Sequence, residues 1–256
     1  MYLQINSDAK KVYLAQTIMI LPLQIGGVIL LFLEERTGAS GLMLIHLSSV
    51  ETLKLFSHHV SIENFDAKGK SWSQCIDHGL YIVQLHTLIM ITLDRVLAVK
   101  LLMRYRLVVT RKRTCLLFIP GWILGIGYAV LYWLASNHGM AISYIVLDSS
   151  ISIFFMVSYT YIILKIKNVR KKTSETSTHH SNAQSVRYHV PLIIVLSYAC
   201  FYLIPDIIIA TGALVLTEWF YVIWDMILIA NPLAYMFGTE SVRHRLLRMF
   251  TCNSET

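Results

Sequence analysis

Long apolar runs separated by short polar segments dominate this chain of 256 residues. A helix that crosses a bilayer needs about 20 mostly apolar residues. Runs of that length lie at about 12–33, 41–60, 75–99, 114–134, 142–166, 189–212 and 219–238. Backbone polar groups must be satisfied inside hydrocarbon, so such runs form helices or a closed barrel, and they do not alternate as barrel strands do. The pattern predicts an all-α integral membrane protein, a seven-transmembrane helix bundle that forms one domain over 1–256.

A different pattern follows the last apolar run. Over residues 240–251, apolar side chains alternate with arginines in "ESVRHRLLRMF". This predicts a short amphipathic C-terminal helix that lies in the headgroup layer of the membrane. Cys252 comes next, at the expected lipid boundary, where palmitoylation is one interpretation and an unmodified tail cysteine is the other.

Composition agrees with a membrane protein and argues against an enzyme. Hydrophobic residues make up 55% of the chain and charged residues only 14%, against roughly 25% charged in soluble domains. The mean hydropathy is +0.58. The sequence contains no glycine-rich phosphate loop, zinc-ligand spacing or nucleophile motif, so it predicts no catalytic residue, no cofactor and no metal site.

The basic residues predict how the bundle is oriented. Fourteen Lys and Arg residues fall in 100–113, 167–188 and the C-terminal tail, and four fall in the alternate segments, Lys10, Lys11, Lys68 and Lys70. Cytoplasmic loops carry the excess of basic residues. We therefore expect an extracellular N-terminus and a cytoplasmic C-terminus. The net charge of +7 then describes a cytoplasmic basic face suited to anionic lipid or to an acidic partner, and nothing in the sequence points to nucleic acid.

Two polar groups of residues interrupt the apolar runs. Asp94 and Arg95 are adjacent ions at the end of 75–99, and charges at such a depth tend to be paired and functional. The alternative is that Arg95 extends to lipid phosphate. In 219–238, Asn231 and Pro232 combine a polar side chain with a missing backbone donor, which predicts a helix with a weak point.

These motifs make the chain similar to the rhodopsin-like G-protein-coupled receptors. "DRVLAV" followed by "RYRLVVTRKR" resembles the family's Asp-Arg-Tyr motif and second cytoplasmic loop, and "NPLAY" resembles its Asn-Pro-x-x-Tyr motif. "LSSVETL" resembles the helix-2 pattern, with Glu51 in place of Asp. Trp122 stands 27 residues after Arg95, as the family's helix-4 Trp does, and Pro205 fits the helix-6 proline. The resemblance covers essentially the whole chain.

The resemblance implies a plasma-membrane receptor that passes an extracellular signal to a heterotrimeric G-protein. Asn231, Pro232 and Tyr235 would form the joint at which helix 7 rearranges. Pro205 would let helix 6 pivot outward. Arg95 would then leave Asp94 and contact the G-protein α subunit. A ligand drives such a two-state bundle only through its higher affinity for the open state.

Several positions depart from the family pattern. Leu203 stands where the family has Trp two residues before the helix-6 proline, Val96 replaces the Tyr of the helix-3 motif, and Ser185 stands where many members place a second acid for the arginine. These departures predict weaker restraint of the resting state and raised ligand-free signalling.

Two carboxylates suggest the class of ligand. Asp77 lies 18 residues before Arg95, five helical turns away on the same face, and amine receptors of this family place their ammonium-binding Asp at that spacing. Asp225 lies seven residues before Pro232, at ligand depth in the family. Together they favour an amine-like cation. The alternative is that Asp77 only marks the end of its helix, and a peptide or lipid ligand remains a second interpretation.

Other classes of protein stay open on the sequence alone. Glu51 and Lys54 are three residues apart and can pair on one helix face.

A seven-helix transporter or proton pump is one alternative, although internal repeats expected of transporters are not found. A receptor-like scaffold that does not signal is another, because of Leu203 and Val96.

Overall fold

A computed structural model describes residues 38–63, 72–101, 104–134 and 137–174, single positions between 11 and 29, and Ile204. Apart from short turns, these residues are helical, and no strand occurs among them. The described helices are α2 (Ala39–Glu63), α3 (Trp72–Leu101), α4 (Tyr105–Val108), α5 (Arg111–Leu134) and α6 (Asn137–Ser174). This part of the chain is therefore all-helical, as predicted.

The helix positions follow the apolar runs closely. The runs predicted at 41–60, 75–99 and 114–134 correspond to α2, α3 and α5, each extended by a few residues. The run at 142–166 corresponds to α6, which continues to Ser174. The described positions within 12–33 and Ile204 within 189–212 are also helical. The run at 219–238 and the amphipathic segment 240–251 lie outside the described residues.

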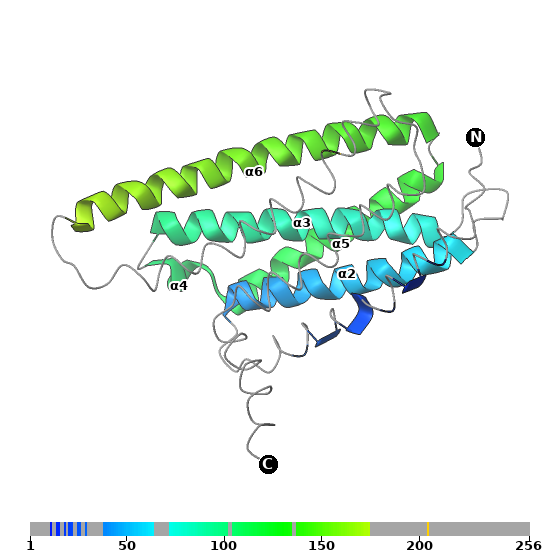
Figure 1. Cartoon of the computed structure of the whole chain (residues 1–256), viewed down its shortest axis with the longest axis horizontal. Coiled ribbons are helices and arrows are strands. Elements are labelled where there is room, and N and C mark those ends of the chain that lie inside the picture. Colours follow the sequence, from blue (N-terminus) through cyan, green and yellow to red (C-terminus); the bar gives the residue numbers. More distant parts are fainter. Residues whose placement is uncertain are drawn as a thin grey trace, which may run out of the picture.

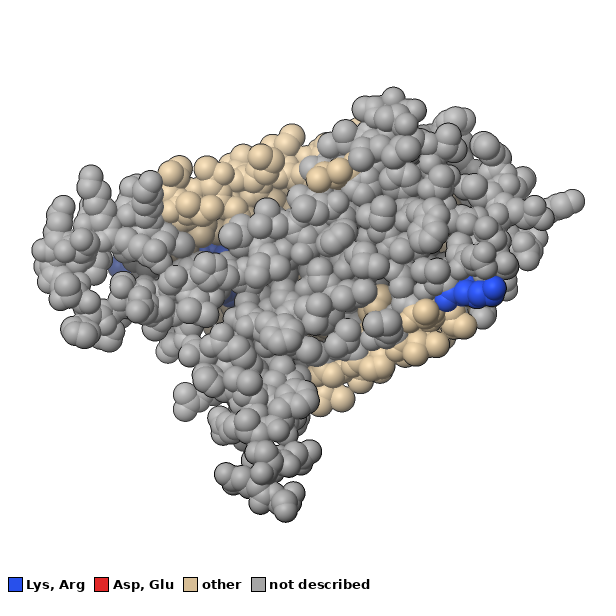
Figure 2. Space-filling model, viewed as in Figure 1, with Lys and Arg blue, Asp and Glu red and all other residues tan. Residues whose placement is uncertain are grey.

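Three of the described helices are long and apolar enough to cross a bilayer. They are α3, α5 and the Val146–Lys165 part of α6. α2 is not among them, because Glu51, Lys54 and several Ser and His residues lower its hydropathy. Figure 2 shows one face of the molecule, on which nearly all of the described surface is uncharged. Its few Lys and Arg atoms lie toward the two ends. These features are typical of a membrane protein.

α3 is the central helix of the described part. It packs against α2, α5 and α6, and Figure 1 shows it running between α6 and α2 with α5 crossing obliquely. Buried apolar side chains from these helices form one core around it, which includes Leu47, Leu55, Leu85, Leu88 and Phe155. The C-terminal part of α6 projects beyond the end of α3 (Figure 1).

α5 buries one narrow face and exposes the rest. Thr114, Gly121 and Gly125 are its buried residues, and spacings of seven and four place them on one side of a helix. Cys115, the neighbour of Thr114, is exposed. The position of Cys115 within an apolar run suggests a small buried hydrophobe, and this interpretation is wrong, because α5 lies at the edge of the described bundle.

Glycines bring α3 and α5 into close contact. A Cβ atom on Gly125 would lie 2.7 Å from the carbonyl oxygen of Gly79 and 2.6 Å from Cγ2 of Val83, and one on Gly79 would lie 2.9 Å from the carbonyl oxygen of Gly125. Small residues at such contacts let helix backbones approach in membranes. A side chain at either position would have to push the helices apart.

This contact leads to a prediction with a matched control. Gly125→Ala is expected to destabilise the fold by about 1–3 kcal/mol, as overpacking does. Gly127, two residues away on α5, has no atom within 4 Å of its Cβ position. Gly127→Ala is therefore expected to be neutral or slightly stabilising. Thermal unfolding of both variants in detergent tests this, and equal midpoints would contradict the contact.

His46 joins α2 to both neighbouring helices. Trp122 Nε1 of α5 donates a hydrogen bond to His46 Nε2 at 3.1 Å, so His46 Nδ1 carries the proton and donates to Thr87 Oγ1 of α3 at 3.0 Å. The imidazole also stacks on Phe118, with ring centroids 3.9 Å apart. These contacts fix the relative positions of the helices that carry the polar sites described next.

Candidate functional site

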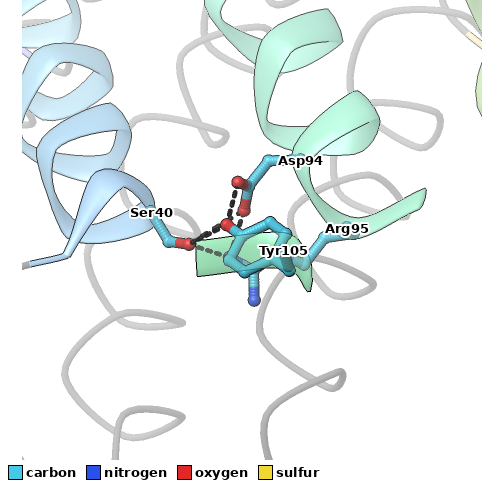
Figure 3. A network of polar contacts seen from close by, with 4 residues as sticks. All are labelled: Ser40, Asp94, Arg95 and Tyr105. Carbon is cyan, nitrogen blue, oxygen red and sulfur yellow. Dashed lines mark hydrogen bonds and ion pairs between the residues drawn. The ribbon is translucent and has the colours of Figure 1, made fainter. Parts of the chain in front are cut away.

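The first candidate site lies where α2, α3 and α4 meet at the basic end of the bundle. Asp94 Oδ2 accepts hydrogen bonds from Ser40 Oγ of α2, at 2.8 Å, and from the guanidinium of Arg95, and Asp94 Oδ1 accepts one from the Tyr105 hydroxyl of α4. Figure 3 shows the four side chains converging. We call this set the Asp94 clamp.

Burial gives the Asp94 clamp its strength. The Asp94 side chain is 1% exposed and that of Arg95 is 16% exposed. A buried carboxylate must be matched by donors or a cation, and here it has both. The guanidinium also contacts Ser40 Oγ, while its Nε finds no hydrogen-bond partner among the described residues. The predicted local pairing of Asp94 with Arg95 is present.

Tyr105 donates a hydrogen bond to the carboxylate of the Asp94 clamp. Burial, and next the negative charge of Asp94, raise the pKa of its phenol from the ordinary value near 10 to about 12. The hydroxyl therefore keeps its proton throughout the physiological range. It lies 3.3 Å from Ser40 Oγ as well as against Asp94, so α4 is tied to both α2 and α3.

A second polar group runs through the interior. Gln84 of α3 accepts a hydrogen bond from Lys54 Nζ at 3.3 Å and donates one to Glu51 at 3.4 Å. Lys54 also lies over the Tyr81 ring, 4.9 Å from its centroid, and the Tyr81 hydroxyl donates to Asp148 of α6. All five residues are buried. We call them the interior polar chain; it links α2, α3 and α6.

The interior polar chain changes the interpretation of Glu51 and Lys54. The sequence predicts a pair on one face of α2, and both residues do point inward, with exposed fractions of 0% and 6%. Gln84 connects them across the α2–α3 interface. Charged groups so placed within a bundle are costly and tend to be functional.

Asp77 lies toward the opposite end of α3 from the Asp94 clamp. The 18 residues between Asp77 and Arg95 correspond to roughly 27 Å of helix. Asp77 is partly exposed, and Ser57 Oγ of α2 lies 3.5 Å from its Oδ1. Its predicted companion Asp225 lies outside the described residues, so the proposed two-carboxylate ligand site stays a prediction.

The other predicted switch residues also lie outside the described part of the chain. These are Pro205, Asn231, Pro232 and Tyr235, together with the lipidation candidate Cys252. Among the described residues, no three His, Cys, Asp or Glu side chains are placed to hold a metal ion.

Sequence reasoning missed the partners that complete these sites. Ser40 and Tyr105 complete the Asp94 clamp, and neither carries a sequence signal beyond its hydroxyl group. Tyr81 and Asp148 extend the interior polar chain. Asp148 had a signal that was overlooked, because an acid within the apolar run 142–166 is costly unless it has a donor.

Models of known protein families give no match to this chain, and no curated protein sequence matches it. The functional interpretation therefore depends on the residues themselves. Chemically, the Asp94 clamp is a reversible network of charge-assisted hydrogen bonds between three helices, and its opening would release a guanidinium at the end of the bundle.

Proposed function

We propose that this chain is a seven-helix membrane receptor of the rhodopsin-like G-protein-coupled type, which transmits an extracellular ligand signal to a heterotrimeric G-protein. The observation that carries the proposal is the Asp94 clamp. It occurs in the "DRVLAV" segment that gives the sequence its resemblance to that family, and it ties Arg95 to α2 and α4 through Ser40 and Tyr105.

The Asp94 clamp could act as a switch that holds or frees the Arg95 guanidinium. Arg95 is held by a carboxylate and a hydroxyl, but it is not deeply buried. Separation of the helix ends by a few ångströms would break the hydrogen bonds that Ser40 of α2 makes with Asp94 and Arg95, and the one that Tyr105 of α4 makes with Asp94. The guanidinium would then be held only by Asp94 of its own helix, and a competing partner could draw it away. The freed guanidinium would then be available to a partner that inserts between the helices. Pro205 and the Asn231–Pro232–Tyr235 joint would supply the movement.

Orientation follows from the same proposal. The end with the Asp94 clamp also carries the basic segment 100–113, so we place it in the cytoplasm and the N-terminus outside the plasma membrane. Asp77 then faces the extracellular half of the bundle. We propose an amine-like cation as ligand, bound through the Asp77 carboxylate and Asp225; a peptide or lipid ligand is the alternative within the same family.

Nucleotide exchange on a purified G-protein tests the proposal. The full chain in lipid nanodiscs would be screened with amines, peptides and lipids. Arg95→Ala is expected to abolish ligand-driven exchange, whereas Arg104→Ala, which removes a nearby exposed base, is expected to retain it. Asp77→Asn is expected to weaken the response to a cationic ligand about a hundredfold, because the bound cation would lose its charged partner in the site. Exchange that is equal for Arg95→Ala and the unmodified chain would refute the proposal.

The interior polar chain favours a second candidate. Ionisable residues inside a membrane bundle mark ion and proton pathways in transporters, and Lys54, Glu51 and Asp148 link three helices here. Ion or proton flux in proteoliposomes without any G-protein, lost in Asp148→Asn, would support a transporter and count against the receptor.

A further inference from the structure

The exposed side of α5 combines lipid-facing residues with a base. Leu116, Ile119, Ile123, Ile126 and Val130 are all more than half exposed. Their spacings of three and four residues keep them on one side of the helix. Lys112, four residues before Leu116, continues the same line at the first turn of α5 and is exposed. We call these six residues the α5 stripe.

More bases lie at the end of the bundle where α5 begins. Lys100 at the end of α3, Arg104 before α4, and Arg111 and Arg113 in the first turn of α5 are exposed, and the sequence from 100 to 113 contains no acid. With Lys112 these residues form what we call the basic collar. Asp94, the nearest acid in the sequence, is buried and occupied within its clamp.

Apolar side chains sit within the basic collar as well. Leu107 and Val108 of α4 are 76% and 42% exposed. Arg113 donates to the carbonyl oxygen of Val108 at 2.9 Å, and this bond holds α4 beside the start of α5. Exposed apolar residues among bases at the end of a spanning helix are suited to the boundary between headgroups and acyl chains.

From this arrangement we infer that the basic collar and the α5 stripe form a binding site for an anionic phospholipid. The acyl chains lie along the α5 stripe and the phosphate headgroup contacts Lys112, while Lys100 and Arg104 add positive charge at the same end of the bundle. Side chains of a helix lean toward its N-terminus, so Lys112 extends away from the apolar residues of the stripe and toward the headgroup layer. An acidic polypeptide would match the bases, but it would leave the α5 stripe without a partner.

The inference does not depend on the receptor proposal, and each can fail without the other. It applies to whichever membrane leaflet the collar faces, because only the charge and the apolar surface are used. Juxtamembrane bases attract anionic lipid by about 1 kcal/mol each, or about fivefold in affinity per base. Three of them acting together would give a preference of about a hundredfold over a zwitterionic lipid.

Lipid selection by the purified full chain tests the site. Phosphatidylserine and phosphatidylcholine of equal chain length would be offered together in detergent, and the bound lipids counted by native mass spectrometry. The unmodified chain is expected to retain phosphatidylserine. The variant K100Q/R104Q/K112Q is expected to lose most of this preference, about fivefold per base. Arg113 is left unchanged because it supports α4.

Two controls make the test decisive. K11Q/K68Q/K70Q removes the same number of bases from other segments of the chain and is expected to keep the preference. Glycerophosphoserine, a headgroup without acyl chains, is expected not to displace the lipid. Equal retention of the two lipids by the unmodified chain, or displacement by the bare headgroup, would overturn the inference. Retention of polyglutamate in place of lipid would also overturn it, in favour of an acidic protein partner.

Discussion

Under the proposed receptor function, Asp94→Asn is expected to raise ligand-free nucleotide exchange on a G-protein by about tenfold. The Asp94 carboxylate accepts from Ser40, Arg95 and Tyr105, and a hydrogen bond to a charged group contributes about 1.5–3 kcal/mol. Asparagine keeps one acceptor oxygen but loses the negative charge that holds the guanidinium. A loss of 1.4 kcal/mol from the closed state corresponds to a tenfold shift in the equilibrium between closed and open forms.

The comparison variants separate this effect from general damage. Asp77→Asn makes the same chemical change in the same helix, far from the clamp, and is expected to leave ligand-free exchange unchanged. Tyr105→Phe removes one donor and should raise it less than Asp94→Asn does. Guanine-nucleotide binding to a reconstituted G-protein, at matched amounts of each variant, measures all three effects. If Asp94→Asn signals no more than the unmodified chain, Asp94 does not restrain Arg95.

Lys54→Met is expected to lower the thermal midpoint of the purified chain by roughly 10 °C. The interior polar chain contains the carboxylates Glu51 and Asp148 and one base, Lys54, all buried. Removal of one partner from a buried charged group typically costs about 3–5 kcal/mol, since it leaves an uncompensated charge. At about 2–4 °C per kcal/mol for a chain of this size, that loss gives the expected shift.

A double variant tests the electrostatic cause. Glu51→Gln combined with Lys54→Met removes one charge of each sign and is expected to recover much of the lost stability, because neutral groups of similar shape replace a buried pair at little cost. Lys11→Met, at an exposed position, is expected to have no effect. If the double variant is less stable than Lys54→Met alone, the carboxylate at Glu51 is not what Lys54 compensates.

The sequence predicted the long helices well because hydropathy marks the part of a helix that lies in lipid. The sequence predicted the ends of the helices less well, because hydropathy does not mark the part of a helix that lies outside the lipid. α6 continues to Ser174 through a polar, basic stretch, and such residues form helix as readily as apolar ones. The four-residue α4 was not predicted, since one turn has no periodicity to detect.

In the candidate sites, contacts between neighbours in the sequence could be predicted, and contacts that depend on helix packing could not. Asp94 and Arg95 are adjacent in the chain, so their pairing could be predicted. Ser40 lies 54 residues from Asp94 in the sequence, and its role depends on how α2 crosses α3. Cys115 was misjudged because an apolar run does not reveal which side faces lipid. On α5 that side follows from the contact of Gly79 with Gly125, which only the packing shows.

The length of α6 has a mechanical consequence. The helix contains 38 residues and is therefore roughly 57 Å long, nearly twice the thickness of a hydrocarbon core of about 30 Å. Its final residues, 166–174, continue the helix beyond Val146–Lys165, the part that is long and apolar enough to cross a bilayer. A tilt of about 10° at Val146 would swing Ser174 sideways by roughly 7 Å. A small change in the tilt of α6 within the bundle would thus become a large sideways displacement of its C-terminal end.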